Sequence, residues 1–98
     1  MTCPQVSGDT WERVADDVRP GWVVTQFDEV AGETQGTVDA VPQLDAGVLR
    51  VPVRWELGMR EDREMVEAPV AQRAVRYVGD SAVLISGTHG MWLFQSER

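Results

Sequence analysis

The chain has 98 residues, enough for a single hydrophobic core, so we expect one domain over 1–98. Its 43% hydrophobic and 26% charged residues are typical of a globular protein and argue against a disordered one. The formal net charge of −7 argues against ordinary nucleic-acid partners and against an anionic membrane surface, because both require basic patches.

All nine basic residues are arginine, and sixteen valines accompany one isoleucine. This bias is typical of a GC-rich bacterial genome, so the choice of arginine need not reflect a requirement for bidentate hydrogen bonds. Cys3 is the only cysteine, which rules out an internal disulfide and a thiol metal cluster. The amino terminus lacks a basic segment followed by an apolar run, and no stretch approaches the roughly 20 apolar residues of a membrane span. We therefore expect a soluble cytoplasmic protein.

The chain begins with a predicted loose lead-in over 1–8, followed by a helix over 9–18 that Asp9 or Thr10 can cap. Pro20 and Gly21 then end the helix. Apolar residues recur at helical spacing on one face of this segment: Trp11, Val14, Ala15 and Val18.

Strands are predicted from there onward. Residues 22–30 are rich in β-branched and aromatic side chains, which favours a first strand with a turn at 31–34. A weaker strand over 37–41 ends at Pro42, and a turn over 45–47 leads into the next strand.

The segment 49–57 carries the clearest strand pattern in the chain. Its odd positions are all apolar, and its even positions are Arg50, Pro52, Arg54 and Glu56. Side chains on a strand alternate between two faces, so this strand has one apolar and one polar face. The polar face is expected to be solvated, although a barrel with a polar interior would turn Arg54 and Glu56 inward.

The charged run 60–64 is predicted as a connection, and 65–78 as a strand that Pro69 interrupts. Residues 82–85 and 91–94 form a hairpin around the turn 86–90. The chain is therefore predicted to be mainly β, with one N-terminal helix and about six strands in a small antiparallel barrel or a strongly curved sheet. Pro52 and Pro69 lack ladder donors and are expected at edges, which a second copy could cover in a homodimer.

The carboxyl-terminal strands carry a family resemblance. Residues 77–87, with Tyr77 and the Ile85-Ser86-Gly87 turn, and then 90–94, with Leu93-Phe94, resemble the end of the plastid lipid-associated (fibrillin) family. The resemblance implies a lipocalin-like barrel that binds an apolar small molecule or lipid inside. It implies no catalytic residues.

The leading functional prediction is therefore an apolar small molecule bound inside the barrel. The same bulky side chains would instead form a filled core if the barrel has no cavity. The predicted walls of the pocket are these: Trp22, Phe27, Val53, Trp55, Tyr77, Trp92 and Phe94.

Two alternatives remain open. One is a cofactor-free cyclase or isomerase of a natural-product pathway, which would use the same pocket with Tyr77, Glu56 and Arg54 as candidate catalytic residues. The other is an acidic interaction or inhibitor module that binds a basic partner. His89 is the only histidine and lies in a predicted turn, so neither a metal site nor a cofactor is expected.

Overall fold

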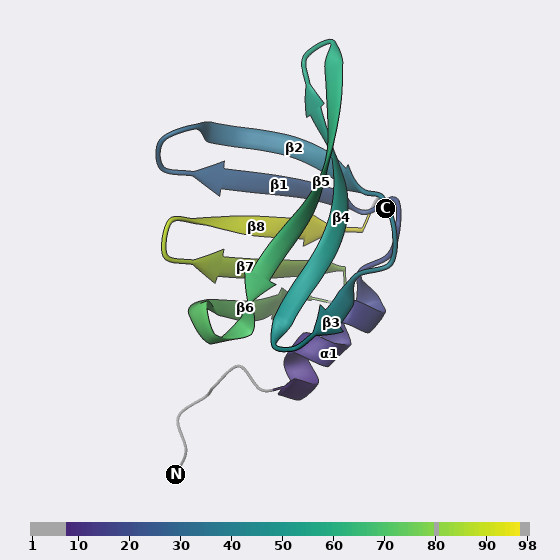
Figure 1. The fold of residues 1–98 in the computed structure, drawn as a ribbon, viewed down its shortest axis with the longest axis vertical. Coiled ribbons are helices and arrows are strands. Elements are labelled where there is room, and N and C mark those ends of the chain that lie inside the picture. The colour runs from purple at the N-terminus through teal and green to yellow at the C-terminus, as the bar shows by residue number, and fades with distance from the viewer. Residues whose placement is uncertain (1–7, 80, 97–98) are drawn as a thin grey trace.

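A computed structural model describes residues 8–79 and 81–96 (Figure 1). The predicted lead-in lies outside the described residues except for Gly8, where the helix α1 (Gly8–Asp17) begins. The apolar face of α1 is buried as its spacing predicts, because Trp11 and Val14 are at most 1% exposed. The helix agrees with the predicted range to within one residue at each end.

Eight strands follow in the described part of the chain, with a single 3-10 turn, Val70–Gln72, between the fifth and the sixth. Their bounds are β1 Val23–Asp28, β2 Gly32–Val38, β3 Gln43–Asp45, β4 Val48–Leu57, β5 Arg60–Pro69, β6 Arg73–Val78, β7 Ala82–Gly87 and β8 Gly90–Gln95.

Every strand pair in the sheet is antiparallel. Strand β4 pairs with β3 and then with β2 along one of its edges, and with β5 along the other. From β2 the order continues through β1, β8 and β7 to β6. The edge strands β5 and β6 are therefore not paired with each other, and the sheet curls into a half-barrel (Figure 1).

The prediction of a mainly β fold with a strongly curved antiparallel sheet and one N-terminal helix is confirmed. Figure 1 shows the long β4–β5 hairpin crossing in front of β1, β8 and β7, with α1 beside β3 at one end. The core lies between these parts. It includes these residues, each at most 5% exposed: Trp11, Val14, Val18, Val24, Val38, Leu49, Val51, Val53, Trp55, Val66, Ala68, Val83, Ile85 and Phe94.

The alternation of 49–57 has the expected consequence. Leu49, Val51 and Val53 face the core, while Arg50 faces outward. The polar face of β4 is therefore the outer face of the half-barrel, and the inverted arrangement does not occur.

The charged run 60–64 was wrongly predicted as a connection. It forms the first half of β5 and pairs with the end of β4, with Arg60 opposite Leu57 and Glu64 opposite Val53. This half of the strand extends beyond the core, so all of its residues are exposed and no apolar alternation marks it. This half-strand and the short β3 were missed by the sequence analysis, which expected about six strands.

The first hairpin was also predicted with the wrong bounds. Its turn falls at Glu29–Ala31, earlier than the predicted 31–34, because the Asp28 carboxylate accepts hydrogen bonds from the N–H groups of Val30 and Ala31 at 2.7 and 2.9 Å. The second strand is Gly32–Val38 and not 37–41. The prediction missed its first half because that half lacks the apolar residues that would indicate a strand.

Pro52 does not mark an edge, because β4 is paired on both sides. Its carbonyl oxygen accepts a hydrogen bond from Asp39 N–H at 2.8 Å, so its nitrogen faces the same side, between the end of β2 and the start of β3. The N–H donor that proline lacks therefore falls where neither β2 nor β3 pairs with β4. Pro69 ends the edge strand β5, as predicted, and the interrupted segment 65–78 is two strands.

Candidate functional site

The inner face of the half-barrel changes from apolar to polar along its strands. On β1, Val24 is followed by Gln26, and on β5, buried Val66 is preceded by exposed Glu64. The cross-strand register places Gln26 opposite Thr34 on one side and opposite Trp92 on the other. The end of the half-barrel away from α1 is therefore lined by polar groups and aromatic rings. We call this region the mouth.

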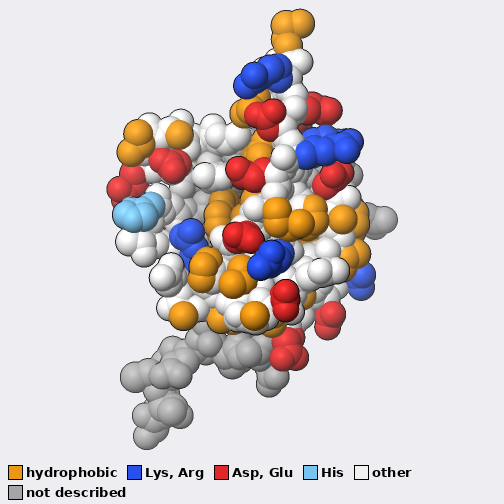
Figure 2. All heavy atoms as spheres, in the orientation of Figure 1, with side chains coloured by type: hydrophobic (Ala, Val, Ile, Leu, Met, Phe, Trp, Pro, Cys, Tyr) orange, Lys and Arg blue, Asp and Glu red, His pale blue; other side chains and the backbone are white. Residues whose placement is uncertain are grey.

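A cleft of about 420 Å³ lies in the mouth between β5 and the β1–β2 hairpin. We call it the β5 cleft. Figure 2 shows the surface hollowed beside the β4–β5 hairpin, along which acidic and basic side chains are interspersed. The residues that line the β5 cleft are Gln26, Thr34, Trp55, Leu57, Asp62, Arg63 and Glu64.

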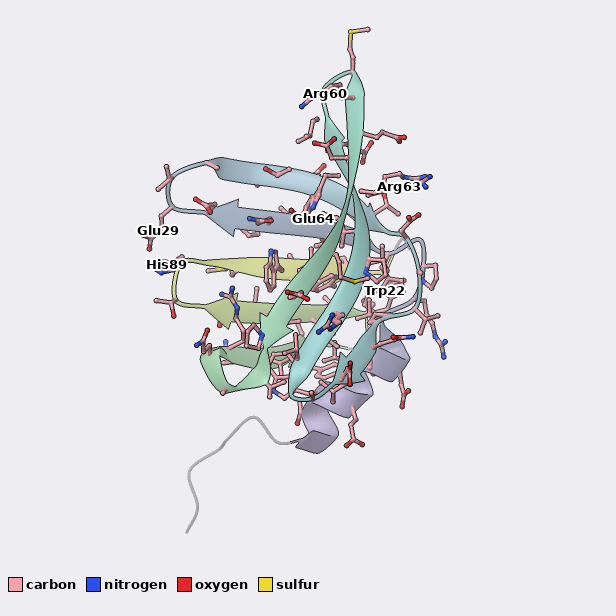
Figure 3. The ribbon with its side chains drawn as sticks, viewed as in Figure 1. Trp22, Glu29, Arg60, Arg63, Glu64 and His89 are labelled. Carbon is pink, nitrogen blue, oxygen red and sulfur yellow. The ribbon has the colours of Figure 1, made fainter. Side chains whose placement is uncertain are left out.

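Trp55 forms the floor of the β5 cleft and fixes one of its carboxylates. The indole N–H of Trp55 donates a hydrogen bond to Glu64 Oε1 at 3.1 Å. Glu64 and Arg63 extend to opposite sides of β5, with Glu64 toward the sheet (Figure 3). The ring of Trp55 packs against its cross-strand partner Gly36, where an added Cβ would lie 2.8 Å from the ring. Glu64 thus presents a carboxylate to the β5 cleft in a defined position.

A second, smaller pocket of about 80 Å³ adjoins the first, since Gln26 lines both. We call it the Arg73 pocket. Its lining residues are Gln26, Phe27, Asp28, Arg73, His89, Gly90, Met91 and Trp92.

Arg73 lies across the inner face of the sheet in this pocket. Its guanidinium carbon stands 4.7 Å from the centre of the Trp92 ring, and its side chain occupies the space that a Cβ on its partner Gly87 would need. The Arg73 Nε atom is buried and has no hydrogen-bond partner among the described residues. The guanidinium is therefore held in place by stacking and not by an ion pair.

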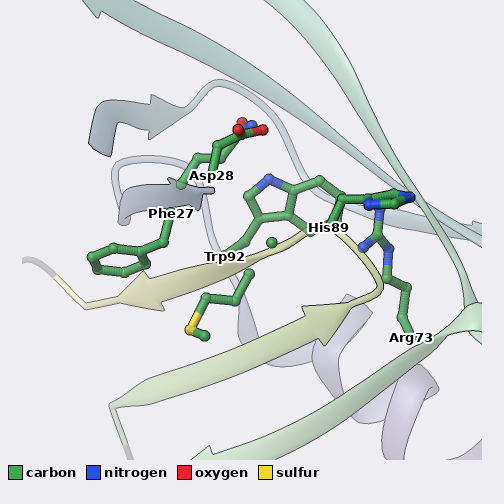
Figure 4. A pocket seen from close by; sticks show the side chains of 8 residues that line it. Phe27, Asp28, Arg73, His89 and Trp92 are labelled. Carbon is green, nitrogen blue, oxygen red and sulfur yellow. The ribbon is translucent and has the colours of Figure 1, made fainter. Parts of the chain in front are cut away.

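The acid of the Arg73 pocket is engaged elsewhere. Hydrogen bonds from the N–H groups of Ala31 and Val30 lower the pKa of Asp28, and nearby His89 lowers it slightly further. In Figure 4, Asp28 lies on one side of the Trp92 ring, and Arg73 and His89 lie on the other. The Arg73 guanidinium thus lies on the other side of the indole from the Asp28 carboxylate.

The predicted pocket walls do not form one site. Trp55 and Trp92 both lie at the mouth, whereas Val53 and Phe94 are at most 1% exposed and belong to the core. The remaining three are half-buried. Trp22 and Tyr77 pack against the core, and Phe27 lies on the opposite face of β1 from Gln26.

The three candidate catalytic residues are not brought together. Arg54 and Glu56 lie on the outer face of β4, where Arg54 pairs with Glu61 at 3.7 Å. Tyr77 lies on the inner face of β6, with the guanidinium of Arg13 stacked 3.9 Å from its ring centre. Burial, and then the charge of Asp17, raises the pKa of Tyr77 to about 12.

The polar residues of the mouth were missed by the sequence analysis. Glu64 was assigned to a connection, and Gln26 and Thr34 are polar residues within or beside segments recognised by their apolar content. Arg73 gives no sequence signal, since its position opposite Gly87 depends on register. Glycines within strands can mark the close packing of a large side chain, and Gly36 and Gly87 lie opposite Trp55 and Arg73.

Comparison of the chain with protein-family models, curated proteins and solved structures gave no match. Within residues 8–79 and 81–96, no helix is long and apolar enough to cross a membrane. The same residues contain no cluster of three or more His, Cys, Asp or Glu side chains that could hold a metal ion.

Proposed function

We propose that this protein binds a small organic molecule with a planar ring in the mouth of the half-barrel. The ring would lie in the β5 cleft, with its polar groups directed toward Glu64, Gln26 and Thr34. The volume of about 420 Å³ falls within the range of small-molecule sites, roughly 300–1,000 Å³.

The observation that carries the proposal is the set of polar side chains at inward-facing positions. Inward positions of a curled sheet normally hold apolar residues that fill its interior. Here Gln26, Thr34 and Glu64 occupy such positions beside Trp55. Convergent polar groups beside an aromatic ring can fix the orientation of a bound molecule.

This proposal moves the ligand from the interior, where the sequence analysis expected it, to the mouth. The resemblance to the fibrillin family implies an apolar ligand deep inside a barrel. In this chain Val53, Phe94 and Trp11 occupy the deep positions and are nearly inaccessible. A ligand at the mouth needs no displacement of these side chains.

The alternative functions receive less support from the arrangement. A cyclase or isomerase using Tyr77, Glu56 and Arg54 would need these groups around one substrate, and they lie on two faces of the sheet. An acidic interaction module favours an uninterrupted acidic face, but the acids of the hairpin are interspersed with arginines, as in the Arg50–Glu67 and Arg60–Asp62 pairs.

Titration of the ¹⁵N-labelled protein with indole, followed by amide NMR spectra, tests the proposal. We expect chemical-shift changes concentrated at Gln26, Thr34 and Glu64 and at the Trp55 indole N–H. Changes spread over the outer face, for example at Leu84 and Leu93, or no changes at millimolar indole, would contradict it.

A further inference from the structure

We propose that Arg73 is the anion-binding residue of this site and that the ligand carries a carboxylate. The carboxylate would enter the Arg73 pocket and pair with the guanidinium, while the ring extends past Gln26 into the β5 cleft. This assignment rests on the proposed function, because it names the chemical class of the ligand in the same mouth.

Among the described residues, Arg73 is a half-buried arginine that pairs with no acidic side chain. Five other arginines of the described chain lie within 4.0 Å of a carboxylate oxygen: Arg13, Arg50, Arg54, Arg60 and Arg63. Arg19 and Arg76 make no such pair with the described residues, but both are exposed and water solvates their charge. Arg73 is partly withdrawn from water, and its Nε has no hydrogen-bond partner within 8–79 and 81–96. Withdrawing part of a cationic group from water without a counter-ion has a cost, and a bound anion would relieve it.

The side chain of Arg73 is already held in one position. It is confined between the Trp92 ring and the backbone at Gly87, where any side chain would collide with it. A guanidinium has a planar set of N–H donors, and a carboxylate can accept two parallel hydrogen bonds from them. Binding would therefore require little ordering of this residue.

The surrounding charges favour a singly charged carboxylate over a phosphate. The pocket measures about 80 Å³ and offers one guanidinium, with His89 beside it. Asp28 lines the same pocket, and Asp62 and Glu64 line the adjoining cleft, so a dianion would meet several negative charges. Asp28 lies beyond the Trp92 ring, and its carboxylate accepts the turn N–H groups. A monoanion is the charge that Arg73 can balance alone.

Three probes that share one ring separate the ligand classes: indole-3-acetate, indole-3-acetamide and tryptamine. We expect indole-3-acetate to bind about tenfold tighter than the neutral amide, because a charge-assisted pair replaces a neutral hydrogen bond. Dissociation constants can be measured by calorimetry, and the NMR signal of Arg73 Nε–H should shift with the acetate alone.

A matched pair of variants tests the residue. Arg73→Gln should abolish the preference for indole-3-acetate over indole-3-acetamide. Arg76→Gln removes the same charge from the same strand on its outer face and should leave the preference intact. Arg73→Lys keeps the charge without the planar donor set and should retain only part of the preference. Far-ultraviolet circular dichroism and melting temperature check that each variant is folded.

The outcomes separate the two proposals. Equal binding of the acetate and the amide, or tighter binding of tryptamine, would overturn the carboxylate assignment and leave ligand binding at the mouth in place. An acetate preference that survives Arg73→Gln would also overturn it. Failure of all three probes to bind at millimolar concentration would overturn the proposed function, and the carboxylate assignment with it.

Discussion

Two glycines on the inner face of the sheet each lie beneath a large side chain of the neighbouring strand. They differ in which atoms an added methyl group would meet. At Gly36 an added Cβ would lie 2.7 Å from the Arg54 carbonyl oxygen and 2.8 Å from the Trp55 ring. At Gly87 it would meet only side-chain atoms of Arg73, which it would displace from the stacked position. The two glycines therefore have different roles. Gly36 leaves room for a backbone carbonyl and a buried ring, whereas Gly87 leaves room for the Arg73 guanidinium.

This difference predicts opposite phenotypes for two alanine variants. Gly36→Ala should lower the free energy of unfolding by about 1–3 kcal/mol, because backbone and a buried ring must shift. Gly87→Ala should cost little stability but weaken binding of indole-3-acetate relative to indole-3-acetamide, because Arg73 is displaced. Denaturant unfolding and calorimetry measure the two effects. Equal loss of stability in both variants would contradict this account of the glycines.

Tyr77 provides a pH-dependent prediction, and it is the only tyrosine in the chain. Its pKa is raised from 10.0 to about 12 by burial and by Asp17, so the folded state holds the phenolic proton more tightly than the unfolded state. The resulting stabilisation is fully present below pH 10 and is lost as the pH rises from 10 to about 12. Tyrosinate absorbance should titrate near 12 in the folded protein, and Tyr77→Phe should lack the corresponding loss of stability. A midpoint near 10 in the folded state would show that the hydroxyl is solvated.

At the scale of elements, the β4–β5 hairpin combines a core half and a solvated half. Next to Pro69, β5 buries Val66 and Ala68, whereas Arg60 to Met65 are all exposed. The sequence predicted β4 correctly because burial on one face imposes a period of two. It could not predict the outer half of β5, since neither face is buried there and register alone keeps it in the sheet. The polar side of the β5 cleft was missed for the same reason.

The transition between the two halves predicts the effect of two neighbouring substitutions. Val66→Ala should reduce the free energy of unfolding by about 2 kcal/mol, because Val66 is 4% exposed and loses two buried methyl groups. Met65→Ala should change it by less than about 0.5 kcal/mol, because Met65 is 51% exposed on the outer face. Chemical denaturation of both variants checks this. The reverse order would contradict the assigned register of β5.

At the scale of the whole molecule, the curl of the sheet separates a filled interior from an open mouth. Strand content, the helix and the orientation of 49–57 could be predicted because local periodicity determines them. The choice between barrel and half-barrel could not, since it depends on whether β5 meets β6. Trp55 and Trp92 lie on the inner face, as expected from the pattern of apolar residues, but depth within the fold decides which rings face the core and which border the pockets of the mouth.

The central claim is that a ligand occupies the β5 cleft, and the indole titration tests it most directly when repeated on two matched variants. Thr34→Trp places a large ring inside the cleft, whereas Gln35→Trp adds the same ring to the opposite, exposed face of β2. We predict that indole-induced shifts at Gln26 and Glu64 persist in the wild type and in Gln35→Trp but disappear in Thr34→Trp. Shifts of equal size in both variants would place the bound indole elsewhere and contradict the account.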